Sequence, residues 1–148
     1  MANVVIHGRD HRANGPNPIA VLLHKKVFAD TFAVATSGGE FYLTITDDLG
    51  GTYLRSAHAA LTTAGGGDLE VQVRNVTEAV DMLSTVVTVD AGETNSYTSA
   101  APHVVDITGT PANNRVSRGD QLRIDIDTAS GTGLEMLLEF GPQLVKLT

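Results

Sequence analysis

The sequence lacks cysteine and tryptophan altogether, and only 5% of its 148 residues are aromatic. The absence of cysteine excludes disulfide bonds, zinc–thiolate sites and cysteine nucleophiles. A domain of this length therefore depends for its stability on a hydrophobic core, on assembly with other chains, or on both. The scarcity of aromatic residues also leaves few side chains that could stack on a sugar ring.

Long hydrophobic runs are also missing. The apolar run near the N-terminus covers residues 19–23, which is too short for the core of a signal peptide or for a membrane span. We therefore expect no membrane partner. We expect the chain to be made and kept in a cytoplasm, or to be built into a particle there.

Positive charge is scarce over most of the chain, whose net charge is −7. Residues 1–26 hold four basic residues and one acidic residue, so this segment carries +3 and residues 27–148 carry −10. An acidic body argues against a nucleic-acid partner, because phosphate binding needs concentrated lysine and arginine. A basic segment on an acidic body indicates docking on an acidic surface. The alternative is a solvated chain end without a docking role.

What the sequence does contain is a regular alternation of apolar and polar residues. In residues 119–140, Leu122, Ile124 and Ile126 alternate with polar residues, and the pattern resumes at Leu134 after a loop of small residues. A side-chain period of two is typical of strands with one buried face. The loop composition favours a turn, so we predict that the two strands form a hairpin.

Further strands are predicted elsewhere along the chain, at residues 41–46, 69–74, 83–89, 97–98, 104–107 and 115–116. Residues 53–63 suit either a helix or a strand, and the strand is preferred. Turns are predicted between the strands, among them residues 37–39 and 64–68.

The chain is therefore expected to contain roughly eight to ten short strands separated by turns, a pattern that predicts an all-β fold. We expect an antiparallel, jelly-roll-like β-sandwich over residues 27–148. The proline and glycine residues within 14–18 interrupt regular structure, so residues 1–26 are predicted to form an extended N-terminal arm.

A glycine run at Gly65, Gly66 and Gly67 suggests a phosphate-binding loop at first sight. Such a loop needs a lysine after its glycines, so that the ammonium group meets the phosphates. Asp68 follows here instead. We therefore interpret the run as a hairpin turn.

Two carboxylates, Asp125 and Asp127, lie on one face of their predicted strand, about 7 Å apart. This separation falls within the range of the paired carboxylates in an inverting glycosidase. The preferred interpretation is a solvated face on which Arg123 is a neighbour.

Other catalytic or metal-binding patterns are weaker. Ser56, His58 and His103 could be combined into a triad, but no nucleophile-elbow motif surrounds the serine, and we interpret their presence as coincidence. His7 and His11 are four residues apart, but no helix is expected there and no third ligand is near. We predict no catalytic residue, no metal site and no cofactor.

Residues 71–140 contain four short motifs and a final strand. They are R-N-V-T at 74–77, D-M-L-S-T at 81–85, an acid-G-E turn at 90–93, G-D-x-L-R-I-D-I-D at 119–127, and the strand ending in L-L-E-F. In these motifs the chain resembles a module of tailed-bacteriophage virion proteins, which are described as head-fibre, capsid-decoration or tail-fibre components. The resemblance implies a β-sandwich displayed in many copies on a particle, and it implies no catalytic residues.

The resemblance and the charge distribution lead to one functional expectation. We expect a non-enzymatic capsid decoration (auxiliary or cement) protein on the capsid exterior of a virion, present in the host cytoplasm during assembly. Its expected partners are the major capsid protein and further copies of itself, with a homotrimer favoured. The arm residues expected to contact the capsid are Val4, Ile6, Arg9, His11, Arg12, Lys25 and Lys26.

Two alternatives use other residues. One is a receptor- or glycan-binding module of a head fibre or tail, in which Tyr42 on a polar strand face stacks on a sugar. An ordinary half-exposed strand tyrosine explains Tyr42 equally simply. The other alternative is a hydrolase that uses the Asp125 and Asp127 pair.

Overall fold

The computed structural model describes residues 23–29 and 37–142. The described part consists of β-strands and one short 3-10 helix, η1 (Ser96–Thr98). The strands are β1 (Leu23–Ala29), β2 (Ser37–Thr44), β3 (Tyr53–Thr63), β4 (Leu69–Asn75), β5 (Val80–Asp81), β6 (Leu83–Thr85), β7 (Val87–Val89), β8 (Val104–Val105), β9 (Gln121–Thr128) and β10 (Thr132–Gly141). No helix among the described residues is long and apolar enough to cross a membrane.

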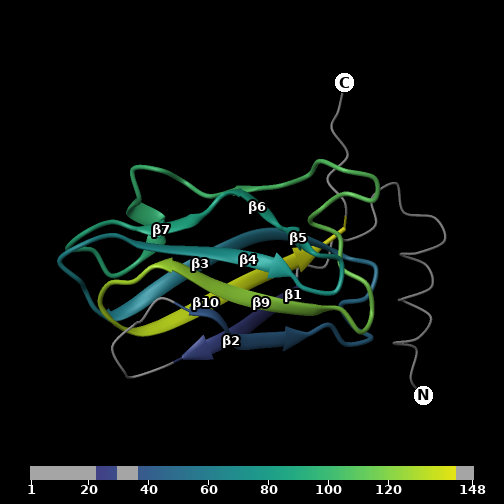
Figure 1. Ribbon diagram of the computed structural model, residues 1–148, viewed down its shortest axis with the longest axis horizontal. Helices are drawn as coiled ribbons and strands as arrows, with labels where there is room; N and C mark the ends of the chain where they lie inside the picture. The colour runs from purple at the N-terminus through teal and green to yellow at the C-terminus, as the bar shows by residue number, and fades with distance from the viewer. Residues whose placement is uncertain (1–22, 30–36, 143–148) are drawn as a thin grey trace, which may run out of the picture.

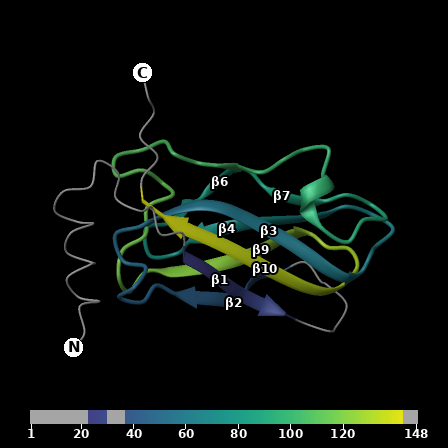
Figure 2. The same ribbon diagram turned by 180° about the vertical axis from the view of Figure 1, so that it is seen from behind.

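The strands form antiparallel sheets. One sheet has the order β1-β10-β3, and a second has the order β2-β9-β4-β5 with β7 also paired to β4. A small third sheet joins β6 to β8. The two larger sheets lie in separate layers: β9 and β4 face the viewer in Figure 1, whereas β10 and β3 face the viewer in Figure 2. The prediction of an all-β, antiparallel chain is confirmed.

The hydrophobic core is one cluster that contains side chains from both of these sheets. On β9 the alternate residues Leu122, Ile124 and Ile126 are buried, and on β10 the alternate residues from Leu134 to Phe140 are buried in the same cluster. Each buried side chain of this size contributes about 1.5–3 kcal/mol to folding. The alternation in the sequence therefore predicted the buried faces of these strands correctly.

The prediction that residues 119–140 form a hairpin is wrong. β9 pairs with β2 and β4, whereas β10 pairs with β1 and β3, so the two strands belong to different sheets. Residues 129–131 carry the chain from one layer to the other. Both arrangements bury one face of each strand, so the alternation of apolar residues does not distinguish two strands of one sheet from two strands of different sheets.

The predicted hairpin turn at residues 64–68 is wrong for the same reason, because it connects β3 in one sheet to β4 in the other. The two connections pack against each other at one end of the molecule. The backbone N–H of Gly67 donates to Ser130 Oγ at 3.2 Å. A Cβ atom added at Gly65 would lie 2.5 Å from the backbone nitrogen of Gly131, which cannot rotate away as the Ser130 hydroxyl can, so this contact needs a glycine.

Three local predictions also need correction. Residues 37–39 are not a turn but the start of β2, whose register shifts between Gly38 and Phe41. Residues 83–89 are not one strand, since β6 pairs with β8 and β7 pairs with β4. Residues 97–98 belong to η1 rather than to a strand. By contrast, residues 53–63 form the strand that was preferred there.

The boundary between arm and body falls inside a strand. Lys25 and Lys26, predicted at the end of the arm, lie in β1, opposite Leu138 and Leu137 of β10. The strand therefore begins before the predicted boundary at residue 26, because its pairing with β10 extends to residue 23. The other predicted capsid-binding residues lie outside the described residues: Val4, Ile6, Arg9, His11 and Arg12.

Candidate functional site

The most concentrated group of polar side chains lies at the free edge of β3. A segment that we call the strap, residues 94–103, runs along this edge and accepts hydrogen bonds from it. The pairs are Leu61 N–H to Thr94 O (2.8 Å), Ala59 N–H to Ser96 Oγ (3.0 Å) and Ala57 N–H to His103 Nε2 (3.2 Å). The strap therefore satisfies backbone groups that an open sheet edge would leave unpaired.

Two histidines and a serine meet where the strap ends. Ser56 Oγ lies 2.7 Å from His58 Nε2 and 3.3 Å from His103 Nε2. The two imidazole rings meet edge to face, with centroids 5.2 Å apart. Tyr97 of η1 stacks on the other side of His58, with centroids 4.1 Å apart. The structure thus brings together three residues whose co-occurrence the sequence analysis interpreted as coincidence.

The hydrogen-bond partners assign the protons in this cluster. Because His103 Nε2 accepts from the N–H of Ala57, its neutral ring carries the proton on Nδ1. His58 Nδ1 is buried and has no hydrogen-bond partner among the described residues. An unpaired N–H at this position would cost more free energy than an unpaired lone pair, so the proton of the neutral ring lies on Nε2. His58 Nε2–H then donates to Ser56 Oγ. The same oxygen lies near His103 Nε2, whose single lone pair already accepts from the N–H of Ala57.

Both rings resist protonation. Burial lowers the pKa of His58 below its ordinary value, and the negative charge of Glu139 offsets part of that effect. Burial also lowers the pKa of His103; the neighbouring His58 lowers it further, and Glu139 again acts in the opposite direction. The rings are only partly buried, so solvent screens these charges.

The arrangement does not have the geometry of a catalytic triad. In a triad, a carboxylate binds Nδ1 of the histidine whose Nε2 takes the proton of the serine. Here His58 Nδ1 has no such partner among the described residues, and a backbone N–H already occupies Nε2 of His103. The cluster is a neutral hydrogen-bonded network, and what it does physically is hold the strap against β3.

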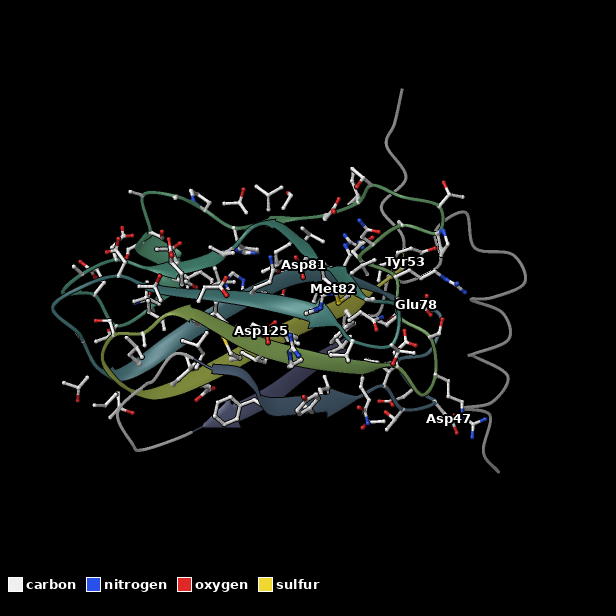
Figure 3. The ribbon with its side chains drawn as sticks, viewed as in Figure 1. Asp47, Tyr53, Glu78, Asp81, Met82 and Asp125 are labelled. Carbon is white, nitrogen blue, oxygen red and sulfur yellow. The ribbon has the colours of Figure 1, made fainter. Side chains whose placement is uncertain are left out.

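The outer face of the β9 and β4 layer holds the two carboxylates considered as a glycosidase pair. Arg123 binds Asp125 through two bonds, Nε to Oδ1 at 2.5 Å and Nη2 to Oδ2 at 2.8 Å. Figure 3 shows Asp125 on this face, with Asp81 nearby. Burial raises the pKa of Asp127, and the charges of Asp125, Glu70 and Asp81 raise it further. The expected neighbour Arg123 is therefore present, as a tight partner of one carboxylate.

Tyr42 lies on the same side of the molecule. Its strand, β2, pairs with β9 so that Tyr42 is opposite Arg123, and 49% of its surface is exposed. Its side chain interacts with Arg123, which together with Asp125 raises the pKa of that guanidinium. The residue proposed for sugar stacking thus has an accessible ring beside a fixed ion pair.

A buried polar pair, which the sequence analysis did not single out, connects two of the motifs. Asp120 Oδ2 accepts from Asn75 Nδ2 at 2.9 Å and from the backbone N–H of Ser117 at 2.8 Å. Both side chains are buried, with 0% of Asn75 and 3% of Asp120 exposed. Asn75 Oδ1 also accepts from the N–H of Glu78 at 3.2 Å. The sequence could have indicated this pair. Asn75 lies on the same face of its strand as the buried residues Val71 and Val73, and a buried asparagine needs a polar partner in the core.

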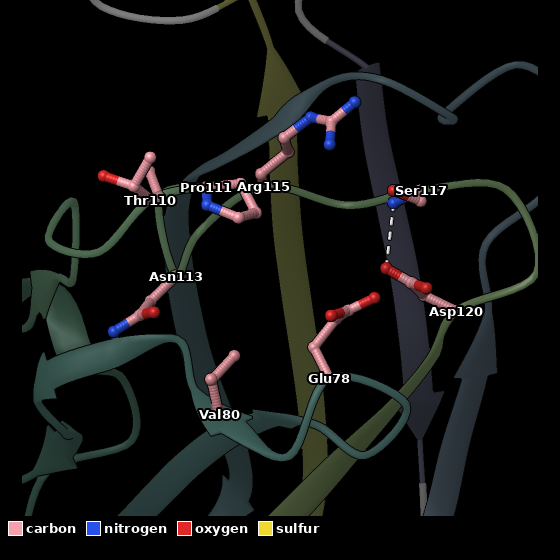
Figure 4. Close-up of a pocket in the computed structure, with 9 residues that line it drawn as sticks. Glu78, Val80, Thr110, Pro111, Asn113, Arg115, Ser117 and Asp120 are labelled. Atoms are coloured by element: carbon pink, nitrogen blue, oxygen red, sulfur yellow. Dashed lines mark hydrogen bonds between the residues drawn. The ribbon is translucent and has the colours of Figure 1, made fainter.

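A pocket of about 240 Å³ opens beside this pair, as Figure 4 shows. Its walls come from the turn before β5 and from the long segment before β9, with Glu78, Asn113, Arg115, Ser117 and Asp120 among the lining residues. Among the described residues no group of three or more histidine, aspartate or glutamate side chains could hold a metal ion.

No protein-family model, no curated protein and no solved structure matches this chain.

Proposed function

We propose that the chain is a non-enzymatic capsid decoration protein of a tailed bacteriophage. In this proposal it binds the major capsid protein on the outside of the capsid and stabilises the lattice. The observation that carries the proposal is that the motifs of the virion-protein resemblance contact one another. Asn75 of R-N-V-T binds Asp120 of the G-D motif, and Arg74 pairs with Asp81 of D-M-L-S-T at 2.6 Å.

These contacts give the motifs a structural role. The N–H of Gln121 donates to Thr77 Oγ1 at 3.0 Å, so the last residue of R-N-V-T also joins the start of β9. A resemblance built on such residues is a resemblance in fold, and it supports a jelly-roll-like β-sandwich. Fold alone does not imply function, so the capsid role rests on the resemblance to virion proteins as an analogy.

Charge supports the same proposal. Residues 27–148 carry −10 and residues 1–26 carry +3. Like-charged bodies repel one another, which keeps densely displayed copies from clumping, while the basic arm is attracted to an acidic capsid surface. Because Lys25 and Lys26 lie in β1, the arm starts directly at the edge of a sheet. We expect the bodies to form a homotrimer at threefold positions of the lattice.

Removal of the arm tests this proposal. Deletion of residues 2–18 leaves β1 intact and is expected to weaken binding to expanded capsids at least about tenfold, equivalent to ~1.4 kcal/mol. Cosedimentation with purified capsids measures the binding. The double variant Arg9→Gln, Arg12→Gln is the control that keeps the length of the arm, and it should bind with intermediate affinity. Full decoration by the truncated chain with an unchanged thermal unfolding curve would show that the arm is not the anchor.

The exposed ring of Tyr42 beside Arg123 favours one second candidate, a glycan-binding module. Tyr42→Ala should weaken binding to a glycan by about fivefold, because an aromatic stacking contact is worth about 1 kcal/mol. Tyr42→Phe keeps the ring and is the matched control, which should retain most of the affinity. A glycan array followed by calorimetric titration measures both variants. This candidate fails when no glycan binds reproducibly or when Tyr42→Ala binds as well as the natural chain.

A further inference from the structure

The strap is attached to β3 at a few points, and two of them depend on neutral histidines. His103 accepts the N–H of Ala57, and His58 stacks against Tyr97 while bound to Ser56. The remaining links to β3 are those of Ser96 and Thr94 and an antiparallel bridge between Asn95 and Ala60. A change in the two rings therefore acts on the contacts that Tyr97 and His103 of the strap make with β3.

A proton on either ring conflicts with this geometry. On His103 it would occupy Nε2, where the N–H of Ala57 already points, so that two donors would face each other. On His58 it would occupy Nδ1, which is buried and has no acceptor among the described residues. The rings are also near each other, so a charge on one disfavours a charge on the second.

The charged groups around the rings come from several elements. Glu139 of β10 lies opposite Ser56 in the register of the sheet and favours the protonated rings. In β1, His24 is opposite Glu139. On the far side of the strap, Asp90 accepts from Ser99 Oγ at 3.2 Å and from Ala100 N–H at 2.8 Å.

Glu93 is the other acid on the strap, where it accepts from Thr98 Oγ1 at 3.5 Å. Three histidines therefore belong to this region, and His58 and His103 are the two that contact the strap or belong to it.

We propose that the strap is an acid-opened latch, in which protonation of His58 and His103 releases residues 94–103 from β3. Release exposes the N–H groups of Ala57, Ala59 and Leu61, a stretch of sheet edge able to pair with another strand. The inference concerns the body of the protein and does not depend on the capsid role.

The sign of the pH dependence follows from the lowered pKa of both rings in the closed state. In the open state the rings have their ordinary pKa of about 6.5, so below that pH the open state binds more protons. The closed state is therefore fully favoured above about pH 6.5 and loses favour as the pH falls. Each ring contributes up to about tenfold per pH unit to the opening equilibrium until its closed-state pKa is reached.

Amide hydrogen exchange followed by NMR tests the latch in the full chain. Protection factors, corrected for the intrinsic pH dependence of exchange, are compared between about pH 7.5 and about pH 5.5, on either side of the ordinary histidine pKa. We expect Ala57, Ala59 and Leu61 to lose protection by up to about tenfold for each ring that protonates. Amides of β9, in the other sheet, serve as the internal control and should keep their protection. Equal protection of Ala57 at both pH values would overturn the proposal.

The matched variant is the double substitution His58→Gln, His103→Gln. A glutamine Oε1 can accept from the N–H of Ala57 much as Nε2 does, but it does not titrate. The variant should keep Ala57 protected at both pH values, and an unchanged pH dependence would overturn the proposal. Should the variant not fold, ring chemical shifts in the natural chain provide the second measurement. The midpoints of His58 and His103 must then lie below about 6.5 and must track the loss of protection at Ala57.

Discussion

Replacement of Gly131 by alanine is expected to lower the free energy of unfolding by about 2–4 kcal/mol, through backbone strain and overpacking together. Gly131 lies in the connection between β9 and β10 with φ = +79°, a conformation that side chains rarely adopt. A Cβ atom there would lie 2.7 Å from the carbonyl oxygen of Thr63 and 2.8 Å from Leu61 Cδ1. The carbonyl belongs to the backbone of β3 and cannot rotate away. Urea unfolding followed by circular dichroism measures the change.

Two other glycines separate strain from crowding. Gly92 has φ = +83° with nothing within 4 Å of an added Cβ, so Gly92→Ala should cost only the strain, about 1 kcal/mol. Gly66 has open space and no positive φ, so Gly66→Ala should change stability by less than about 0.5 kcal/mol. Equal losses at Gly131 and Gly92 would contradict the close packing of the two connections between the sheets.

The same connections show what alternation in a sequence predicts and what it leaves open. The pattern in β9 and β10 predicted which residues are buried, because a period of two depends only on the geometry of one strand. It did not predict the pairing partners, because a strand beside β9 and a strand across the core from it need the same buried face. A loop of small residues fits both cases, so the hairpin was predicted where the chain crosses between sheets.

The candidate site was harder to predict than the strands, because some of its residues are far apart in the sequence. Ser56 and His58 are two residues apart in a strand, so their shared face could be predicted once the strand was chosen. His103 is 45 residues beyond His58, and no local pattern places it at the edge of β3. The strap binds mainly through backbone groups of β3, which carry no sequence signal.

The buried pair of Asn75 and Asp120 gives the second large effect. Asp120→Ala is expected to destabilise the chain by about 2–4 kcal/mol, because it leaves the buried amide of Asn75 and the partly buried N–H of Ser117 without their acceptor. Asp120→Asn keeps the shape and one acceptor oxygen but loses the charge, so it should cost only about 1 kcal/mol. Urea unfolding of both variants measures the difference.

A double-mutant cycle distinguishes a specific contact from general damage to the core. Asn75→Ala and Asp120→Ala should show a coupling energy of about 1–3 kcal/mol, because the two side chains are buried and hydrogen-bonded to each other. The matched cycle uses Asp47 and Arg118, an ion pair at 2.6 Å whose side chains are 79% and 78% exposed. That pair should show no measurable coupling, since solvent screens it. Equal coupling in the two cycles would mean that Asn75 and Asp120 do not hold the two motifs together. Strong coupling only in the buried pair would mean that the motifs specify how β4 meets β9, which is the property a resemblance in fold requires.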